Sequence, residues 1–170
     1  MVRRLECGAK MRRLVAVAGF VLLASTAFAE PQSEISAYRK SYGLPAVTVD
    51  PKLTELAGKQ ANAMAERSSL DHNAYASFRT RMAPYDTLSA AENIAMGTRT
   101  FGDTLAVWKS SSGHDANLLL RSATRIGVAS ASSRGTTHWA LILAAPSEPN
   151  SGRVEVLSIF PFVTLMRIAP

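Results

Sequence analysis

The chain has 170 residues and a mass of 18.2 kDa; 47% of its residues are hydrophobic, 19% are charged and 7% are aromatic. This length predicts one domain, or one domain with a targeting segment. A mean hydropathy of +0.05 excludes a disordered chain, and a single cysteine excludes an internally disulfide-linked scaffold. The formal charge of +6 would suit nucleic-acid binding, so its position along the chain decides what it means.

The N-terminal segment has the pattern of a secretory signal peptide. All its basic residues lie within 1–13, an apolar run follows over 14–27, and small residues stand at Ala27 and Ala29. We therefore expect cleavage after Ala29 and a secreted or periplasmic protein that begins at Glu30. The apolar run is shorter than the about 20 residues that a membrane span needs, so no transmembrane span is expected in the mature protein.

Removal of residues 1–29 changes the chain that folds. The segment carries five of the 19 basic residues and one of the 13 acidic residues, which leaves a net charge of +2 on residues 30–170, and it also carries Cys7. No cluster of basic residues interleaved with aromatic residues remains, so we expect no nucleic-acid partner, and we expect a monomeric single domain. The sequence leaves open whether Met1 or Met11 is the start, because both precede an adequate basic region.

Two helices are predicted first. One is expected over residues 33–42, ended by Gly43 and Pro45. The next is expected to begin at Pro51 with Asp50 as its N-cap, because proline lacks the N–H that would be unpaired there. Its apolar side chains recur on one face, which should be buried: Leu53, Leu56, Ala57, Ala61 and Met64.

In the rest of the chain, the spacing of the apolar residues changes from that of helices to that of strands. A short helix is expected over 77–82 and another over 103–111, whereas residues 70–100 are otherwise without a clear pattern. Strands are expected over 125–130, 138–145 and 154–159, joined as an antiparallel meander. The strand 138–145 is apolar in both alternating sets and should lie in mid-sheet with helices on each side. The apolar segment 160–168 should pack against the sheet. Helices first and strands last predict an α+β sandwich.

His114 has the most informative setting of the histidines. Ser112 and Asp115 fit a capping box, which would place His114 in the first turn of a short helix, where the positive helix end disfavours the imidazolium. Asn117 lies on the same face and could orient the ring or tie down a neighbouring loop. Ser111 could pair with His114 as a nucleophile, although a capping or loop role is commoner for such a serine.

Glu92 and His72 could complete a site with His114. Glu92 lies in an apolar run and must be hydrogen-bonded, paired or protonated if it is buried. Two histidines and a carboxylate could bind a divalent metal such as zinc. The alternative interpretation is that Glu92 anchors a loop to backbone amides while the histidines are half-exposed.

Short motifs follow one another in a recognisable order over about residues 34–145. They are Tyr38-Arg39-Lys40, Gly43-Leu44-Pro45, Asp50-Pro51-Lys52-Leu53, Asp71-His72, Phe78 with Arg81, Glu92-Asn93-Ile94-Ala95 with Gly97, Trp108 with Ser111, Gly113-His114, Asn117-Leu118, Gly127-Val128 and Trp139. This order resembles the CAP superfamily, the SCP-like or allergen V5/Tpx-1-related domain, in its short bacterial form.

The resemblance implies a three-layer α-β-α sandwich with a central antiparallel sheet, a domain core over about 34–159, and a cleft with two histidines and two acidic residues. His72, Glu92 and His114 match three of these four positions. The fourth, a glutamate, has no counterpart, because Ser111 stands at that place. Members of the family are secreted; some bind a divalent metal between the histidines, others bind sterols or fatty acids, and proteolysis has been proposed for a few.

Three functions are compatible with these features. The first is a secreted or periplasmic protein without established catalysis that binds a small ligand, a cell-envelope component or a divalent metal in this cleft. The candidate cleft residues are His72, Glu92, Ser111, His114 and Asn117, with His72 and His114 as metal ligands. The alternative is a metal-dependent hydrolase of cell-envelope or peptide substrates, with Glu92 as general base. The third is an interaction module that uses its C-terminal segment.

Overall fold

The computed structural model describes residues 30–146 in full and the secondary structure of residues 153–160 and 163–169; the predicted signal peptide and the segment 147–152 lie outside the described residues. In chain order the elements are α1 (Pro31–Ser41), β1 (Thr48–Val49), α2 (Pro51–Arg67), α3 (Phe78–Met82), β2 (Thr87–Met96), α4 (Phe101–Ser110), α5 (Ser112–Leu118), β3 (Arg125–Ser133), β4 (Thr136–Pro146), β5 (Arg153–Phe160) and β6 (Val163–Ala169).

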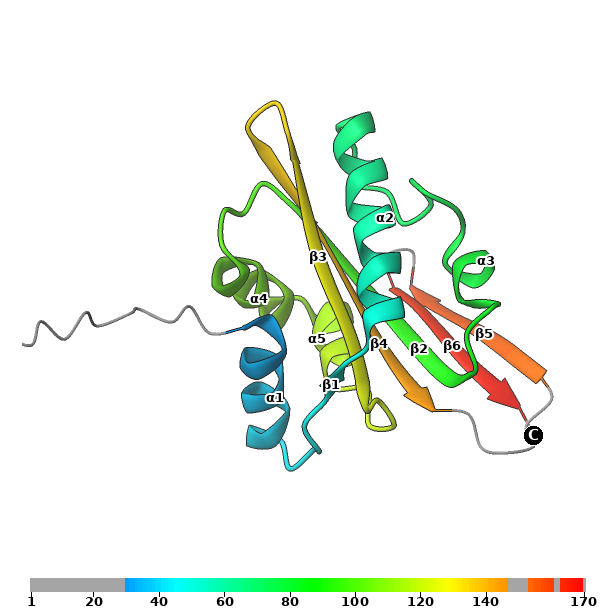
Figure 1. Ribbon diagram of the computed structural model, residues 1–170. Helices are drawn as coiled ribbons and strands as arrows, with labels where there is room; N and C mark the ends of the chain where they lie inside the picture. The colour runs from blue at the N-terminus through cyan, green and yellow to red at the C-terminus, as the bar shows by residue number, and fades with distance from the viewer. Residues whose placement is uncertain (1–29, 147–152, 161–162, 170) are drawn as a thin grey trace, which may run out of the picture.

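These elements form three layers around one sheet with the strand order β1-β3-β4-β2-β6-β5. Helices α2 and α3 cover one face, and α1, α4 and α5 lie on the other (Figure 1). Every described strand pair is antiparallel except β1–β3. The predicted α-β-α sandwich is therefore confirmed, with one parallel pair at its edge. No helix in the described part of the chain is long and apolar enough to cross a membrane.

The predicted end of α1 and the predicted start of α2 have the expected causes, although α1 begins two residues earlier than predicted. Helix α2 starts at Pro51, and the Asp50 side chain accepts hydrogen bonds from the backbone N–H groups of Lys52 and Leu53 at 2.9 and 3.2 Å. Gly43, which follows α1, has a φ of +71°, a backbone conformation that glycine adopts without steric cost. The predicted apolar face of α2 is buried in the core between this helix and the sheet.

Strand β2 was not predicted, although it lies near the middle of the sheet. Side chains on both of its faces are buried: Ala90 and Ile94 belong to the core under α2, and Ala95 belongs to the core under α4. A strand buried on both faces has no alternation of polar and apolar residues, so its sequence pattern does not distinguish it from a loop or a helix. The weak periodicity of residues 70–100 therefore gave no prediction for this strand.

The predicted meander was also wrong in part. β3 and β4 pair as neighbours, and β4 is central as expected, but its second neighbour is β2 rather than β5. The C-terminal segment does not pack on a face of the sheet, since β6 is itself a strand that pairs with residues 89–91 of β2 and with β5. The pairing of β6 with β2 joins segments that are far apart in the chain, and no local pattern in the sequence specifies it.

The approach of α2 to β3 is close enough to require a glycine. A Cβ atom added to Gly127 would overlap the backbone of Leu53 and Thr54. We expect Gly127→Ala to lower the free energy of unfolding by about 3 kcal/mol, because rigid backbone must move. The matched control is Gly58→Ala, whose Cβ would meet only the Ala129 Cβ at 3.8 Å. Urea unfolding of both variants checks this, and equal stability of the two would refute it.

Candidate functional site

Glu92 is the buried centre of the site. It lies on β2 with no exposed surface, and its carboxylate is held by Arg81, which reaches Oε2 through Nη1 at 2.5 Å and Oε1 through Nη2 at 2.9 Å. Two parallel N–H···O bonds between charged groups form the strongest pairing available to a carboxylate. The expectation that a buried Glu92 would be paired is confirmed. The alternative of an anchor on backbone amides was wrong.

Arg81 is the residue of this site to which the sequence analysis gave no role, although it stands among the motifs of the family resemblance. It lies on α3, and its remaining bonds go to backbone oxygens: Nε donates to Ala76 O at 2.9 Å and Nη2 to His72 O at 2.8 Å. The side chain therefore fixes both Glu92 and the segment that carries His72. A signal did exist, because a cation is one of the partners that a carboxylate in an apolar run can take, and the expected short helix contained Arg81 three residues after Phe78.

His72 joins the site directly. Its Nδ1 lies 2.8 Å from Glu92 Oε1, and its side chain is 17% exposed. Because an ionised carboxylate only accepts hydrogen bonds, Nδ1 carries the proton in this contact. In the neutral ring, the lone pair is then on Nε2. This is the arrangement by which a carboxylate orients an imidazole toward a ligand.

His114 reaches the site from the other helical layer. It lies in α5, but the predicted capping box does not form, because the N-cap is Ser111 and no side chain caps the helix. The Ser111 hydroxyl instead lies 3.0 Å from His114 Nδ1, and Asp115 accepts a hydrogen bond from the Tyr38 hydroxyl at 2.5 Å. The helix begins one residue earlier than a Ser112 cap would need, so Ser112 lies in its first turn rather than before it.

Burial lowers the pKa of His114 below its ordinary value, and the nearby His72 ring lowers it further. The ring is therefore neutral at pH 7, as predicted, although the reasons are desolvation and a second imidazole rather than the helix end. Of the predicted residues, His72 contacts Glu92, and His114 contacts Ser111.

Asn117 ties α5 to β2. Its buried side-chain amide donates to Glu92 O at 3.1 Å and to Asn93 Oδ1 at 2.9 Å, while Asn93 Nδ2 donates to His114 O at 3.0 Å. Of the two roles considered for Asn117, the contact with a neighbouring segment is the one observed. Within the described residues, no group of three His, Cys, Asp or Glu side chains is arranged to hold a metal ion.

The family model of the cysteine-rich secretory proteins, CAP, matches residues 32–143. The chain belongs to the CAP family. The uncharacterized protein YkwD of Bacillus subtilis is 30% identical over 101 residues, which are 55% of this chain and 38% of YkwD. The chain thus spans well under half the length of this relative.

Solved structures with the same fold are similar to this CAP domain. An outer surface protein of Borrelia burgdorferi has a TM-score of 0.62 and 20% identity, over 68% of this chain and 90% of that one. An extracellular protein containing an SCP domain from Bacillus anthracis has a TM-score of 0.60 and 20% identity, over 68% of this chain and 39% of that one. At these identities the likeness concerns the fold.

The lowered pKa of His114 makes the stability of this CAP domain depend on pH. In the unfolded chain, His114 binds a proton at its ordinary pKa of about 6.5, whereas in the folded domain it does so only at lower pH. The contribution of His114 to the free energy of unfolding is therefore full above about pH 6.5, and it is lost as the pH falls toward the lower pKa of the folded domain. We expect His114→Gln to lose less stability than wild type between pH 7.5 and pH 5 in urea unfolding. Equal losses of stability in wild type and His114→Gln over this pH range would contradict this expectation.

Proposed function

We propose that this CAP-domain protein is exported and binds a divalent cation, zinc in the first instance, between His72 and His114. The proposal rests on one observation above all, the hydrogen bond from His72 Nδ1 to Glu92. A carboxylate behind an imidazole fixes its tautomer and raises its strength as a ligand. Export is supported by the N-terminal pattern of residues 1–29, and by the resemblance of the fold to an outer surface protein and an extracellular protein.

The donor set suits such an ion. Both candidate ligands are imidazoles, and the lowered pKa of His114 keeps its ring neutral at pH 7, the state in which a histidine binds a metal. The contact of Ser111 Oγ with His114 Nδ1 orients that ring as Glu92 orients the other. Two protein ligands are fewer than the three usual at a catalytic zinc, which suits a site that shares the ion with a bound molecule.

Glu92 acts in this proposal as a positioning residue. Both of its oxygens accept hydrogen bonds, from Arg81 and His72, within a site where Glu92 has no exposed surface. A general base must reach the water or substrate whose proton it takes, and Glu92 would have to leave these partners to do so. The hydrolase hypothesis assigned that role to Glu92, and no contact of this residue favours it.

The test is zinc titration of residues 30–170 by calorimetry at pH 7.5. Wild type should bind, and the His72→Ala/His114→Ala variant should bind at least tenfold more weakly. The matched control is Asp71→Asn beside His72, which should bind as wild type does, since an asparagine can still accept from Asn73 N as Asp71 does at 2.8 Å. Equal affinity of wild type and the double variant would end the metal proposal. Mass spectrometry of exported protein should find Glu30 at its N-terminus.

A further inference from the structure

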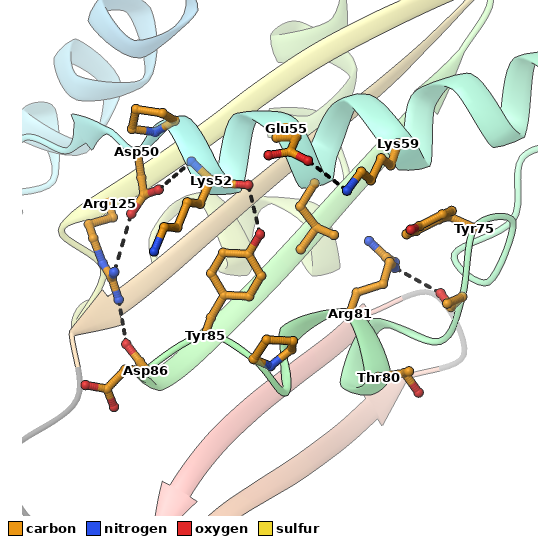
Figure 2. A pocket seen from close by; sticks show the side chains of 14 residues that line it. Asp50, Lys52, Glu55, Lys59, Tyr75, Thr80, Arg81, Tyr85, Asp86 and Arg125 are labelled. Atoms are coloured by element: carbon orange, nitrogen blue, oxygen red, sulfur yellow. Dashed lines mark hydrogen bonds and ion pairs between the residues drawn. The ribbon is translucent and has the colours of Figure 1, made fainter.

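A second candidate site lies between α2 and α3 and shares Arg81 with the site already described. We call it the α2–α3 groove; it has a volume of about 1110 Å³ and is open to solvent along the helices (Figure 2). One wall is the face of α2 from Pro51 to Lys59, and the other runs from Tyr75 to Asp86. The space exceeds the roughly 300–1,000 Å³ of a small-molecule pocket, so it suits an extended ligand.

The groove carries charges of both signs at intervals. Among its described lining residues are four basic side chains, Lys52, Lys59, Arg81 and Arg125, and three acidic side chains, Asp50, Glu55 and Asp86. Lys59 pairs with Glu55 at 2.7 Å, and Arg125 pairs more loosely with Asp50 at 3.4 Å. Such a lining offers hydrogen-bond donors and acceptors side by side. It suits a ligand whose groups both donate and accept, as hydroxyl groups do.

One end of the groove adds a site for a carboxylate. Arg81 has five N–H donors, and four of them are used, by the two Glu92 oxygens, His72 O and Ala76 O. The Arg81 side chain is only 1% exposed, so this fifth donor, on Nη1, is out of reach of a ligand in the groove. The Lys59 ammonium points into this same end, where the Tyr75 ring also lies (Figure 2). The exposed Lys59 ammonium uses one of its three donors on Glu55, and its other two are open to an anionic group of the ligand.

Two tyrosine rings provide apolar surface along the groove. Tyr75 is 49% exposed, and Tyr85 stands between the walls with its hydroxyl donating to Lys52 O at 3.0 Å (Figure 2). Rings of this kind present a flat apolar face beside polar groups, which is the surface that the C–H face of a sugar covers. Charged groups that can bind hydroxyls therefore occur in one groove with two tyrosine rings, of which Tyr75 is exposed and Tyr85 is partly buried.

We propose that the α2–α3 groove binds an extended glycan that carries carboxylate groups. Its carboxylate contacts Lys59, and its sugar rings lie on Tyr75 and Tyr85. A peptide is a poorer fit, because peptides are recognised through a sheet edge or an apolar groove, and the α2 wall is a polar helix face whose backbone groups are already bonded. The proposal does not depend on the metal at His72 and His114.

The test uses trigalacturonate, a soluble trisaccharide of uronic acids, titrated into residues 30–170 by calorimetry. We expect saturable binding that Tyr75→Ala and Lys59→Ala each weaken at least tenfold. The matched control is Lys40→Ala, which removes an exposed lysine of α1 on the other side of the sheet and should leave binding unchanged. Urea unfolding confirms that each variant is folded.

A second titration separates a glycan site from simple attraction of charge. Triglutamate carries several carboxylates without sugar rings, and it should bind at least tenfold more weakly than trigalacturonate. Equal binding of the two compounds would overturn the glycan assignment. Two results would refute the proposal that the α2–α3 groove binds a glycan. One is a lack of trigalacturonate binding at millimolar concentration, and the other is binding that Tyr75→Ala leaves unchanged.

Discussion

Replacing Arg81 with methionine should lower the free energy of unfolding by about 3–5 kcal/mol, since it leaves the charge of Glu92 buried without its partner. The Arg81 side chain is 1% exposed and that of Glu92 is not exposed at all, so water cannot replace the lost contact. The backbone oxygens of Ala76 and His72 would lose donors in addition. The segment that holds His72 would therefore loosen, and zinc affinity should fall with stability.

Urea unfolding of a double-mutant cycle measures this expectation. Arg81→Met and Glu92→Leu should each destabilise strongly, whereas the double variant should cost clearly less than the sum, because it leaves neither charge unpaired. Arg79→Met on the same helix is the matched control, since Arg79 is exposed, and its effect should stay within about 0.5 kcal/mol. Additive costs in the cycle would show that Arg81 and Glu92 do not stabilise each other.

The parts of the fold that were predictable are those determined by neighbours in the sequence. Asp50 and Pro51 begin α2, Gly43 ends α1, and the period of the α2 side chains identifies its buried face. Ser77 caps α3 at the place where a short helix was expected, its hydroxyl accepting from Thr80 N at 3.2 Å. In each case, the physical cause lies within about four residues of its effect.

The parts that were not predictable depend on contacts between distant segments. β2 lacks alternation because both its faces are buried, and its neighbours β4 and β6 come much later in the chain. The site shows the same division. His72, Glu92 and His114 were candidates from their residue types and settings, and the family resemblance matched them to one cleft. The role of Arg81 required knowing that α3 lies against β2 at Glu92. Spacing alone could not have given that contact.

Arg39 is a second buried cation, and it is held without a carboxylate in the described part of the chain. It has no exposed surface, and its guanidinium donates to four backbone oxygens: Pro45 O at 3.1 Å, Leu118 O at 2.8 Å, Leu120 O at 3.0 Å and Ala123 O at 2.9 Å. Burial lowers the pKa of Arg39. The side chain thus joins α1 to the end of α5 and to the turn before β3, and it donates to Leu118 O, a carbonyl group in the last turn of α5 that has no partner within the helix.

Arg39→Met should therefore cost about 3–5 kcal/mol of unfolding free energy, since several buried carbonyl groups lose their donors at about 1–3 kcal/mol each. Arg39→Lys keeps the charge but has three donors at a single point, so it should recover only part of this loss. The neighbouring Lys40→Ala is the control, because Lys40 is exposed, and it should change little.

The effect on α5 links this prediction to the site. Because α5 carries His114, loosening its C-terminal end should also weaken zinc binding in Arg39→Met, and Lys40→Ala should leave it unchanged. Urea unfolding and zinc calorimetry on the same samples test both effects. A loss of stability below about 1 kcal/mol in Arg39→Met would mean that water takes over these carbonyl groups. In that case, Arg39 would not be what fixes α5, and with it His114, against the rest of the domain.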